Sequence, residues 1–137
     1  MVRNFLYRSE TLLQPHDLEF RMILEHPRSR NSNMAVTGYL HCEDGIFHQW
    51  VEGPEAELRI VERCIYESRS HYGQTILSRD AVSTKQFLGW HMALGVSEKN
   101  SLFDFVAIQG VRTLHRTEYA AGVLAFMRAQ SDTTSPF

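Results

Sequence analysis

The sequence predicts an α+β fold in which one sheet packs against helices. Three observations predict this fold class. Short runs rich in β-branched and aromatic residues recur along the chain, with stretches of helical apolar spacing between them. One pair of these runs is joined by residues 43–45 (Glu-Asp-Gly), in which Asp-Gly is a dipeptide typical of tight antiparallel turns. The length of 137 residues suits a single domain that buries a core without metal or disulfide support.

The first half of the chain predicts a strand, a helix and a hairpin, in that order. Residues 2–7 are the first expected strand. The helix begins at Pro15 and ends before Pro27, because proline suits the first turn of a helix and disfavours helix at the residue before it. Residues 36–42 and 46–52 are two further strands, joined as a hairpin by the Asp-Gly turn.

The second half predicts a helix, two strands and two final helices. The helix begins at Pro54 and turns an apolar stripe inward. Strands are expected over residues 74–82 and 87–94. The order β-α-β-β-α-β-β is a ferredoxin-like arrangement with an added fifth strand. Residues 101–107 and 113–129 are expected to form C-terminal helices that dock outside this core.

The chain contains no internal repeat and no linker before its polar end. We therefore expect one domain over residues 1–95, a helical extension over 96–129 and a frayed tail over 130–137. The tail is expected to fray because it is rich in Ser, Asp and Thr.

Composition argues against several classes of protein. The 14 basic and 16 acidic residues leave a net charge of -2, which gives no sign of a nucleic-acid partner. No apolar run approaches the roughly 18 residues of a membrane span, and the amino terminus has no signal-peptide core. We therefore expect a cytoplasmic protein without a membrane partner. The two cysteines and seven histidines lack metal-ligand spacing, so no metal is expected.

Gln49 is the first candidate for a functional role. Alternation along the strand over 46–52 places it on one face with Phe47 and Val51. Leaving the polar atoms of a buried glutamine unpaired costs about 1–3 kcal/mol, so we expect a polar partner in the core. Tyr7, near the end of the first strand, could be that partner. A hydrogen bond to backbone at a strand edge is the alternative that the pattern leaves open.

Four segments carry a resemblance to a known family. They are residues 6–9 (Leu-Tyr-Arg-Ser), Asn31 with residues 36–38 (Val-Thr-Gly), residues 45–53 (Gly-Ile-Phe-His-Gln-Trp-Val-Glu-Gly) and residues 87–92 (Phe-Leu-Gly-Trp-His-Met). In this combination and spacing they resemble BLUF domains, which are blue-light sensors using FAD. The resemblance covers about residues 2–95 and is far more specific than any single motif.

The resemblance implies a flavin between the two helices of the ferredoxin-like sheet, with FAD expected and FMN or riboflavin as alternatives. Tyr7 would be the light-driven electron and proton donor, and Gln49 the hydrogen-bonding switch between tyrosine and flavin. Trp90 and Met92, on the last strand, would report the switch outward. A neutral glutamine that rotates or changes tautomer alters hydrogen bonds to the ring without breaking a covalent bond. Which of Trp90 and Met92 faces Gln49 in the dark stays open.

Further residues would bind the cofactor if the resemblance holds. Asn31 would bind the polar edge of the flavin. Four others have an equally ordinary interpretation, as a surface arginine, a solvated helix end, a structural histidine or protection of an edge strand. These four are Arg30, Arg69, His71 and Lys85. The complete set of cofactor-binding candidates is Tyr7, Arg30, Asn31, Phe47, Gln49, Arg69, His71, Lys85 and Met92.

The end of the second helix departs from the family pattern. Ser68 and Ser70 stand where family members commonly carry an aspartate and an arginine. The missing arginine could weaken flavin binding, so a flavin-free scaffold that only binds partners is one alternative function. An acylphosphatase-like hydrolase, with Arg8 and Asn31 around a phosphate, is another. It is disfavoured because residues 8–12 contain no glycine for a phosphate-cradling loop.

The sequence also bears on output and assembly. Too few residues follow position 95 for a cyclase or phosphodiesterase domain, so we expect no enzyme activity and a signal read in trans by a partner protein. On the sheet face away from the two ferredoxin-like helices, four residues should form an aromatic patch: Tyr39, His41, His48 and Trp50. Either the C-terminal helices or a second subunit of a homodimer should cover this patch.

Overall fold

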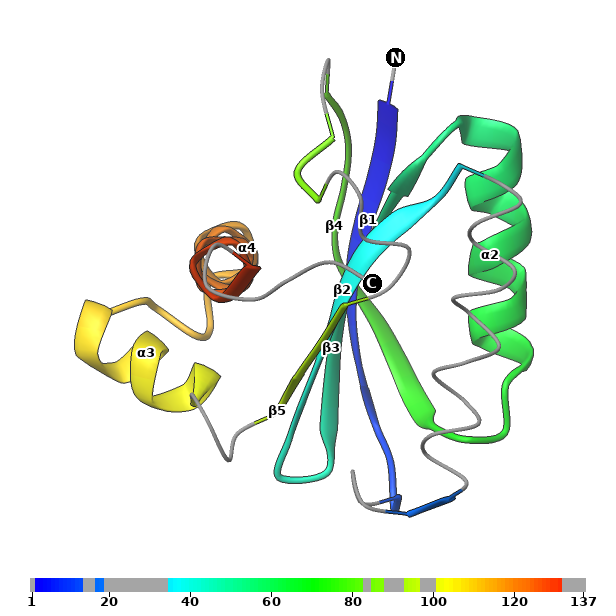
Figure 1. Ribbon diagram of the computed structural model, residues 1–137. Coiled ribbons are helices and arrows are strands. Elements are labelled where there is room, and N and C mark those ends of the chain that lie inside the picture. The colour runs from blue at the N-terminus through cyan, green and yellow to red at the C-terminus, as the bar shows by residue number, and fades with distance from the viewer. Residues whose placement is uncertain are drawn as a thin grey trace.

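In the part of the chain that the structure describes, five strands form one sheet in the order β4-β1-β3-β2-β5 (Figure 1). The computed structural model describes residues 2–13, 17–18, 35–82, 85–87, 93–96 and 101–131. The strands are β1 (Val2–Glu10), β2 (Thr37–Glu43), β3 (Ile46–Gly53), β4 (Tyr72–Val82) and β5 (Ala93–Val96). The pairs β4-β1, β1-β3 and β3-β2 are antiparallel, whereas β5 runs parallel to β2. This is the predicted ferredoxin-like sheet with a fifth strand added at its edge.

The predicted hairpin is confirmed, with a connection one residue shorter than expected because Glu43 belongs to β2. Glu43 and Ile46 are paired residues, so the connection between β2 and β3 consists of Asp44 and Gly45 alone. Both have positive φ, 52° for Asp44 and 74° for Gly45. Two consecutive left-handed residues are what a type I′ turn requires, and Asp-Gly meets this need at low steric cost.

The last predicted strand includes one described residue, Phe87, that lies in a bend rather than in a strand. The predicted strand over residues 87–94 corresponds to β5 at Ala93–Val96, and Phe87 lies in the segment before it. Phe87 is 1% exposed, and its backbone N–H donates to the side chain of Glu52. An apolar residue anchored in the core produces the same local pattern as a strand residue, which explains why Phe87 was assigned to the strand.

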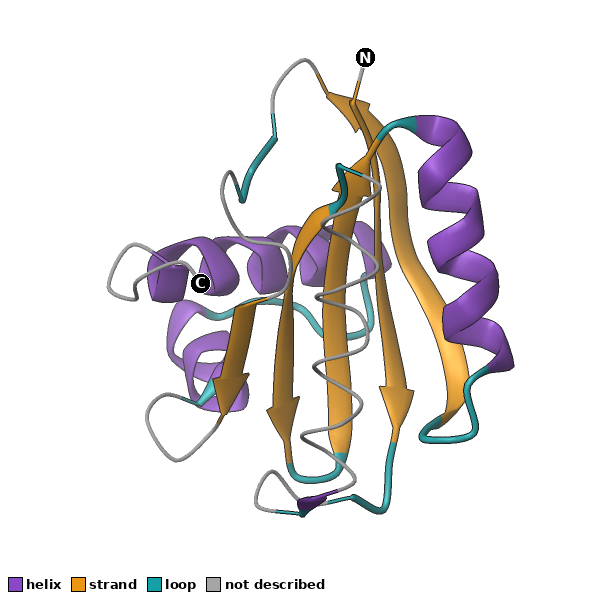
Figure 2. Cartoon of the chain, turned by 45° about the vertical axis from the view of Figure 1, so that its right-hand side comes forward, coloured by secondary structure: helices purple, strands orange, loops and turns teal. Residues whose placement is uncertain are grey.

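Helices cover both faces of the sheet (Figures 1 and 2). Helix α2 (Glu55–Glu67) lies on one face, and α3 (Leu102–Gln109) and α4 (Arg116–Ser131) lie on the other. Helix α2 starts directly after Pro54 and has acidic residues in its first turn, which suits the helix dipole. Its inward stripe packs in one cluster with residues of β1, β3 and the start of β2: Leu58, Val61, Ile65, Phe5, Tyr7, Val36 and Val51.

The chain's own C-terminal helices cover the predicted aromatic patch. A second core cluster unites Tyr39 and Trp50 of the sheet with Leu102 and Val106 of α3 and with α4. The α4 members of the cluster are Ala120, Val123, Phe126 and Met127. Of the two covers that the sequence left open for this surface, the structure shows self-coverage.

Helix α3 is attached to the sheet by a carboxylate. Glu43, 4% exposed at the end of β2, accepts hydrogen bonds from the Ser101 hydroxyl (2.6 Å) and from the backbone N–H of Leu102 (2.7 Å). Ser101 is also the N-cap residue of α3, because its side chain accepts from the N–H of Asp104. An acceptor from another element thus satisfies helix donors that lack an intrahelical partner.

Several expectations fall outside the described residues. They are the helix predicted to start at Pro15, most of the tail, and the candidates Arg30, Asn31, Trp90 and Met92. Among the described helices, none combines the length and hydropathy that a membrane span requires.

Candidate functional site

Tyr7 and Gln49 meet as predicted. They are directly opposite each other in the antiparallel pairing of β1 and β3. Both are buried, and the Tyr7 hydroxyl donates a hydrogen bond to Oε1 of Gln49. Since β3 lies between β1 and β2 in the interior of the sheet, Gln49 is not at a strand edge. The polar partner inferred from burial is therefore present, and it is the tyrosine.

The walls around this pair are aromatic and apolar. The rings of Phe5 and His71 lie 6.2 Å and 5.9 Å from the Tyr7 ring, measured between centroids. His71 is also 5.9 Å from the Phe47 ring, so Phe47 borders the same region. Phe47 forms a small apolar cluster with Leu40, Cys42 and Leu13. The phenol and the carboxamide are thus the polar groups of a largely apolar surface.

His71 lies at the border of this site, with a hydrogen-bond partner at each ring nitrogen. Its Nδ1 lies 2.7 Å from the Ser9 hydroxyl, and its Nε2 lies 3.1 Å from the carbonyl oxygen of Ile65. Burial lowers the pKa of His71, and the bond to Ile65 only partly opposes this effect. The ring is therefore neutral near pH 7 and already engaged at both nitrogens, so a ligand would meet its ring surface.

The two other described basic candidates lie at turns. Arg69 is exposed in the turn that follows α2. Flanking it, Ser68 accepts a hydrogen bond from the Ser70 backbone N–H. Lys85 donates from Nζ to the carbonyl oxygen of Ala35 at 2.7 Å, which ties it to the turn before β2. Cofactor binding by Arg69 and by Lys85 stays a prediction.

The opposite face of β3 carries Glu52, a buried acidic residue to which the sequence assigned no role. Glu52 is fully buried, and its carboxylate accepts from Trp50 Nε1 (2.8 Å), Thr37 Oγ1 (3.1 Å) and the N–H groups of Gln86 (2.9 Å) and Phe87 (2.8 Å). It thereby binds β3 to the start of β2 and to the segment before β5. An acidic residue inside a strand rich in apolar and aromatic residues was the signal that could have indicated this role.

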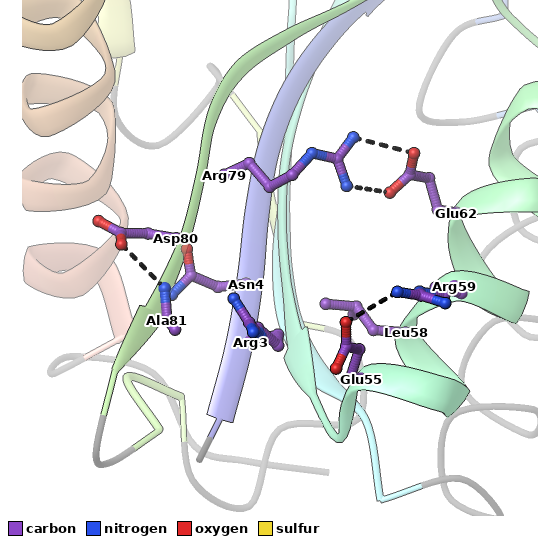
Figure 3. A pocket seen from close by; sticks show the side chains of 9 residues that line it. All are labelled: Arg3, Asn4, Glu55, Leu58, Arg59, Glu62, Arg79, Asp80 and Ala81. Atoms are coloured by element: carbon purple, nitrogen blue, oxygen red, sulfur yellow. Dashed lines mark hydrogen bonds and ion pairs between the residues drawn. The ribbon is translucent and has the colours of Figure 1, made fainter.

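A separate pocket of about 320 Å³ lies between α2 and the β1-β4 edge (Figure 3). Its lining holds basic and acidic side chains that largely pair with each other. Arg79 forms two hydrogen bonds with Glu62, at 2.5 Å and 2.9 Å, and Arg59 pairs with Glu55 at 2.9 Å. The pocket contains neither Tyr7 nor Gln49. In the described part of the chain, no group of three metal-ligating side chains gathers.

Comparison with known families identifies the protein family of the chain that carries the Tyr7–Gln49 site. The family model for sensors of blue-light using FAD, the BLUF domain, matches residues 2–93. This chain belongs to the BLUF family. The match includes both strands that carry the tyrosine and the glutamine, so these residues of the BLUF domain lie inside the matched region. A search of curated proteins finds no significant match.

Solved structures share the fold of this BLUF domain. The dark-state structure of BlrB, a BLUF protein, has a TM-score of 0.79 at 22% identity and covers 94% of this chain and 96% of its own. The photo-activated state of BlsA has a TM-score of 0.74 at 21% identity, over 90% and 95% of the two chains. A bacterial light-regulated adenylyl cyclase has a TM-score of 0.69 at 22% identity, over 91% of this chain but 36% of its own.

The described residues of this BLUF domain fit a flavin on chemical grounds. A flavin ring is flat and mostly apolar, with nitrogen and oxygen atoms along one edge, so its site needs apolar walls and a few directed polar groups. Phe47, Leu40 and Cys42 supply apolar surface, and Tyr7 and Gln49 supply the polar groups. Burial raises the pKa of the Cys42 thiol to about 11, so this sulfur is an inert wall rather than a nucleophile.

Proposed function

We propose that this BLUF domain senses blue light through bound FAD and passes the change to a partner protein. The observation that carries the proposal is the buried hydrogen bond from Tyr7 to Gln49, on a face whose other residues suit a flavin. When bound, the flavin supplies absorption of blue light and a ring able to accept an electron. FAD is favoured because the family is described as using it.

The Tyr7 hydroxyl carries its proton and donates it in a hydrogen bond to Oε1 of Gln49. A phenol is oxidisable, and an oxidised phenol is strongly acidic, so the proton would leave along this bond. The burial of both residues keeps water from competing for the proton. This accounts for a tyrosine here, because phenylalanine would pack as well but carries no proton to move.

The Gln49 side chain is suited to change its hydrogen bonds after the light-driven change at Tyr7. One end of its side chain has an acceptor oxygen and the other has two N–H donors. Rotation of the carboxamide, or a change of tautomer, reverses what Gln49 offers to Tyr7 and to a neighbouring ring. In either case the new pattern persists without a covalent bond to the protein, and reversal in the dark restores the first one.

The proposal extends to output and assembly. Residues 1–95 form the flavin-binding domain, with Asn31, Arg30, Arg69, His71, Lys85 and Met92 as further cofactor contacts. Trp90 and Met92 pass the change to the extension over 96–129, and a cytoplasmic partner reads it in trans.

A homodimer through the aromatic patch is not compatible with the cover provided by α3 and α4. A dimer through another surface remains part of the proposal and is tested by light scattering of the purified protein.

The acylphosphatase-like alternative has lost its main support. Arg8, which was to follow the first strand in a loop, lies within β1, since that strand extends to Glu10. Its partner across β3 is His48, on the sheet face that α3 and α4 cover. A phosphate-cradling loop cannot form at a residue held in a central strand.

The absorption spectrum of the purified protein, in the dark and under blue light, tests the proposal. We expect a bound-flavin spectrum that moves modestly to the red under illumination and recovers in darkness. Mass spectrometry of the released flavin separates FAD from FMN and riboflavin. A colourless protein that takes up no added flavin would refute the proposal and favour the flavin-free scaffold.

A further inference from the structure

His48 occupies a special position next to the proposed switch. It precedes Gln49 in β3, so the two side chains point to opposite faces of the sheet. Their Cα atoms are adjacent in the same strand, so a displacement of the β3 backbone at Gln49 would also move His48. A rearrangement of Gln49 that displaces the strand backbone on the α2 face would therefore also reach His48 on the α4 face.

His48 contacts both C-terminal helices. Its Nε2 lies 2.9 Å from the hydroxyl oxygen of Tyr119 in the first turn of α4. Its ring meets the Tyr119 ring at 5.8 Å and the Phe103 ring of α3 at 6.1 Å, measured between centroids. The Tyr119 backbone N–H bonds to the His115 carbonyl at 2.9 Å, so a pull on this side chain acts on the start of α4.

The hydrogen bond to Tyr119 is well defined because His48 is buried and neutral. The ring is 0% exposed, and this burial lowers the pKa of His48 to about 3. A neutral imidazole has one donor and one acceptor nitrogen. Within the described residues Nδ1 has no hydrogen-bond partner, so Tyr119 is the single polar attachment seen for this ring.

We propose that the His48–Tyr119 hydrogen bond is a through-sheet link that carries a rearrangement of Gln49 directly to helix α4. His48 and Tyr119 are positioning residues in this link. The inference rests on the proposed function, since it needs a light-driven change at Gln49. It differs from a route through Trp90 and Met92 because it runs through the backbone of β3 and needs no movement of the segment before β5.

Hydrogen exchange of the flavin-loaded, full-length protein tests the link. Backbone exchange of α4 is compared in the dark and under continuous blue light, together with the flavin spectrum. In the wild type we expect light to change exchange in the first turns of α4. In Tyr119→Phe the spectral shift should keep its normal size, while the light-induced change in α4 is lost.

Two further variants and a control separate a lost link from general damage. His48→Gln keeps a polar nitrogen near the position of Nε2 and should retain the response of α4, whereas His48→Leu should lose it. Tyr66→Phe alters a tyrosine of α2 that is 46% exposed, and it should behave as the wild type.

The outcomes distinguish the two levels of inference. A wild type without a spectral shift would overturn the proposed function and this link with it. A wild type with a normal shift, combined with an α4 that does not respond or that responds equally in Tyr119→Phe, would overturn the link alone.

Discussion

Successive residues of β3 lie on opposite faces of the sheet and have different hydrogen-bond partners. Gln49 points to the α2 face and holds the Tyr7 hydroxyl, while its neighbours His48 and Trp50 point to the α4 face. Polar side chains are buried on both faces. A buried polar group that loses its hydrogen-bond partner costs stability, so the partners of these residues are the first places where a substitution should be felt.

Replacement of Gln49 should separate flavin binding from signalling. Gln49→Leu has nearly the same size and removes both the acceptor and the donors of the switch. We expect flavin to remain bound and the light-induced red shift to disappear completely, as recorded by absorption spectroscopy. A shift of normal size in this variant would remove Gln49 from the mechanism.

Tyr7→Phe is the companion variant and should also stop the photocycle. An unaffected photocycle in Tyr7→Phe would mean that another residue is the donor.

Loss of the Glu52 charge should destabilise the fold. The four donors around Glu52 all need acceptors, and in Glu52→Gln an amide group replaces one of the two accepting oxygens. We expect the free energy of unfolding to fall by about 2–3 kcal/mol in urea denaturation. Glu67→Gln, at the exposed end of α2, is the matched control and should change stability little. Equal stability of the two variants would contradict the assigned role of Glu52.

The buried histidines should make the protein sensitive to mild acid. The pKa of His48 is about 3 in the folded chain, because burial disfavours the charged ring, and about 6.5 when unfolded. Below about pH 6.5 the His48 imidazole is protonated in the unfolded chain but stays neutral in the folded chain. The free energy of unfolding therefore falls as the pH drops toward 3. His41 and His71 also have lowered pKa values and add to the effect in the same direction.

Urea denaturation at a series of pH values between 7.5 and 5 measures this dependence. The contribution of His48 to the slope approaches about 1.4 kcal/mol per pH unit at its steepest. His48→Gln should show a shallower decline than the wild type. Parallel curves for the two proteins would show that His48 does not titrate in this way.

At the scale of elements, single carboxylates join parts that are distant in sequence. Glu43 of β2 caps the start of α3, and Glu52 of β3 holds the segment before β5. Burial by itself would raise the pKa of Glu43, but its hydrogen bonds from His41, Ser101, Leu102 and Phe103 outweigh this and lower it. The ionised carboxylate also suits the positive end of the α3 dipole. The Glu43 charge thus adds to the apolar packing that docks α3 on the sheet.

Removal of that charge should loosen α3 locally. In Glu43→Gln the side chain keeps its shape but loses the negative charge and one acceptor. We expect the backbone amides of Leu102 and Phe103 to exchange at least about tenfold faster, equivalent to about 1.4 kcal/mol of protection. Hydrogen exchange measured by NMR reports this, with Glu67→Gln again as the control. Unchanged protection at these two amides would show that Ser101 caps the helix without help.

At the scale of the whole molecule, the C-terminal helices share one core with the sheet. Leu6, Trp50 and Phe87 lie in a common cluster with residues of α3 and α4. Helix α4 runs across the strands on the face opposite α2 (Figure 2). Because this cluster would be exposed without the helices, we infer that the sheet and the two helices unfold together.

A cavity in α4 should therefore destabilise the entire fold. Phe126 is 2% exposed, and its ring packs against His41 of β2 at 4.9 Å. We expect Phe126→Ala to lower the free energy of unfolding by about 3–5 kcal/mol. Circular dichroism and Trp fluorescence should still report one coincident transition. If the helical signal were lost first while the sheet unfolded as in the wild type, α3 and α4 would be an independent unit.

The sequence by itself determined the features that depend on local pattern. Alternation assigned Gln49 to an apolar face and predicted that it needs a polar partner, and the Asp-Gly dipeptide predicted the hairpin. Motif spacing indicated the family that the comparisons then showed. These signals lie within a few residues or depend on strand periodicity, so they can be interpreted without knowledge of the packing.

Only the tertiary structure decided which distant groups meet. The Tyr119 partner of His48 is 71 residues away, and the backbone donor Phe87 is 35 residues from Glu52. The parallel pairing of β5 with β2 and the covering of the aromatic patch likewise join separate parts of the chain. No local periodicity encodes such contacts, because they result from how the helices and strands pack once the apolar faces of the sheet are buried.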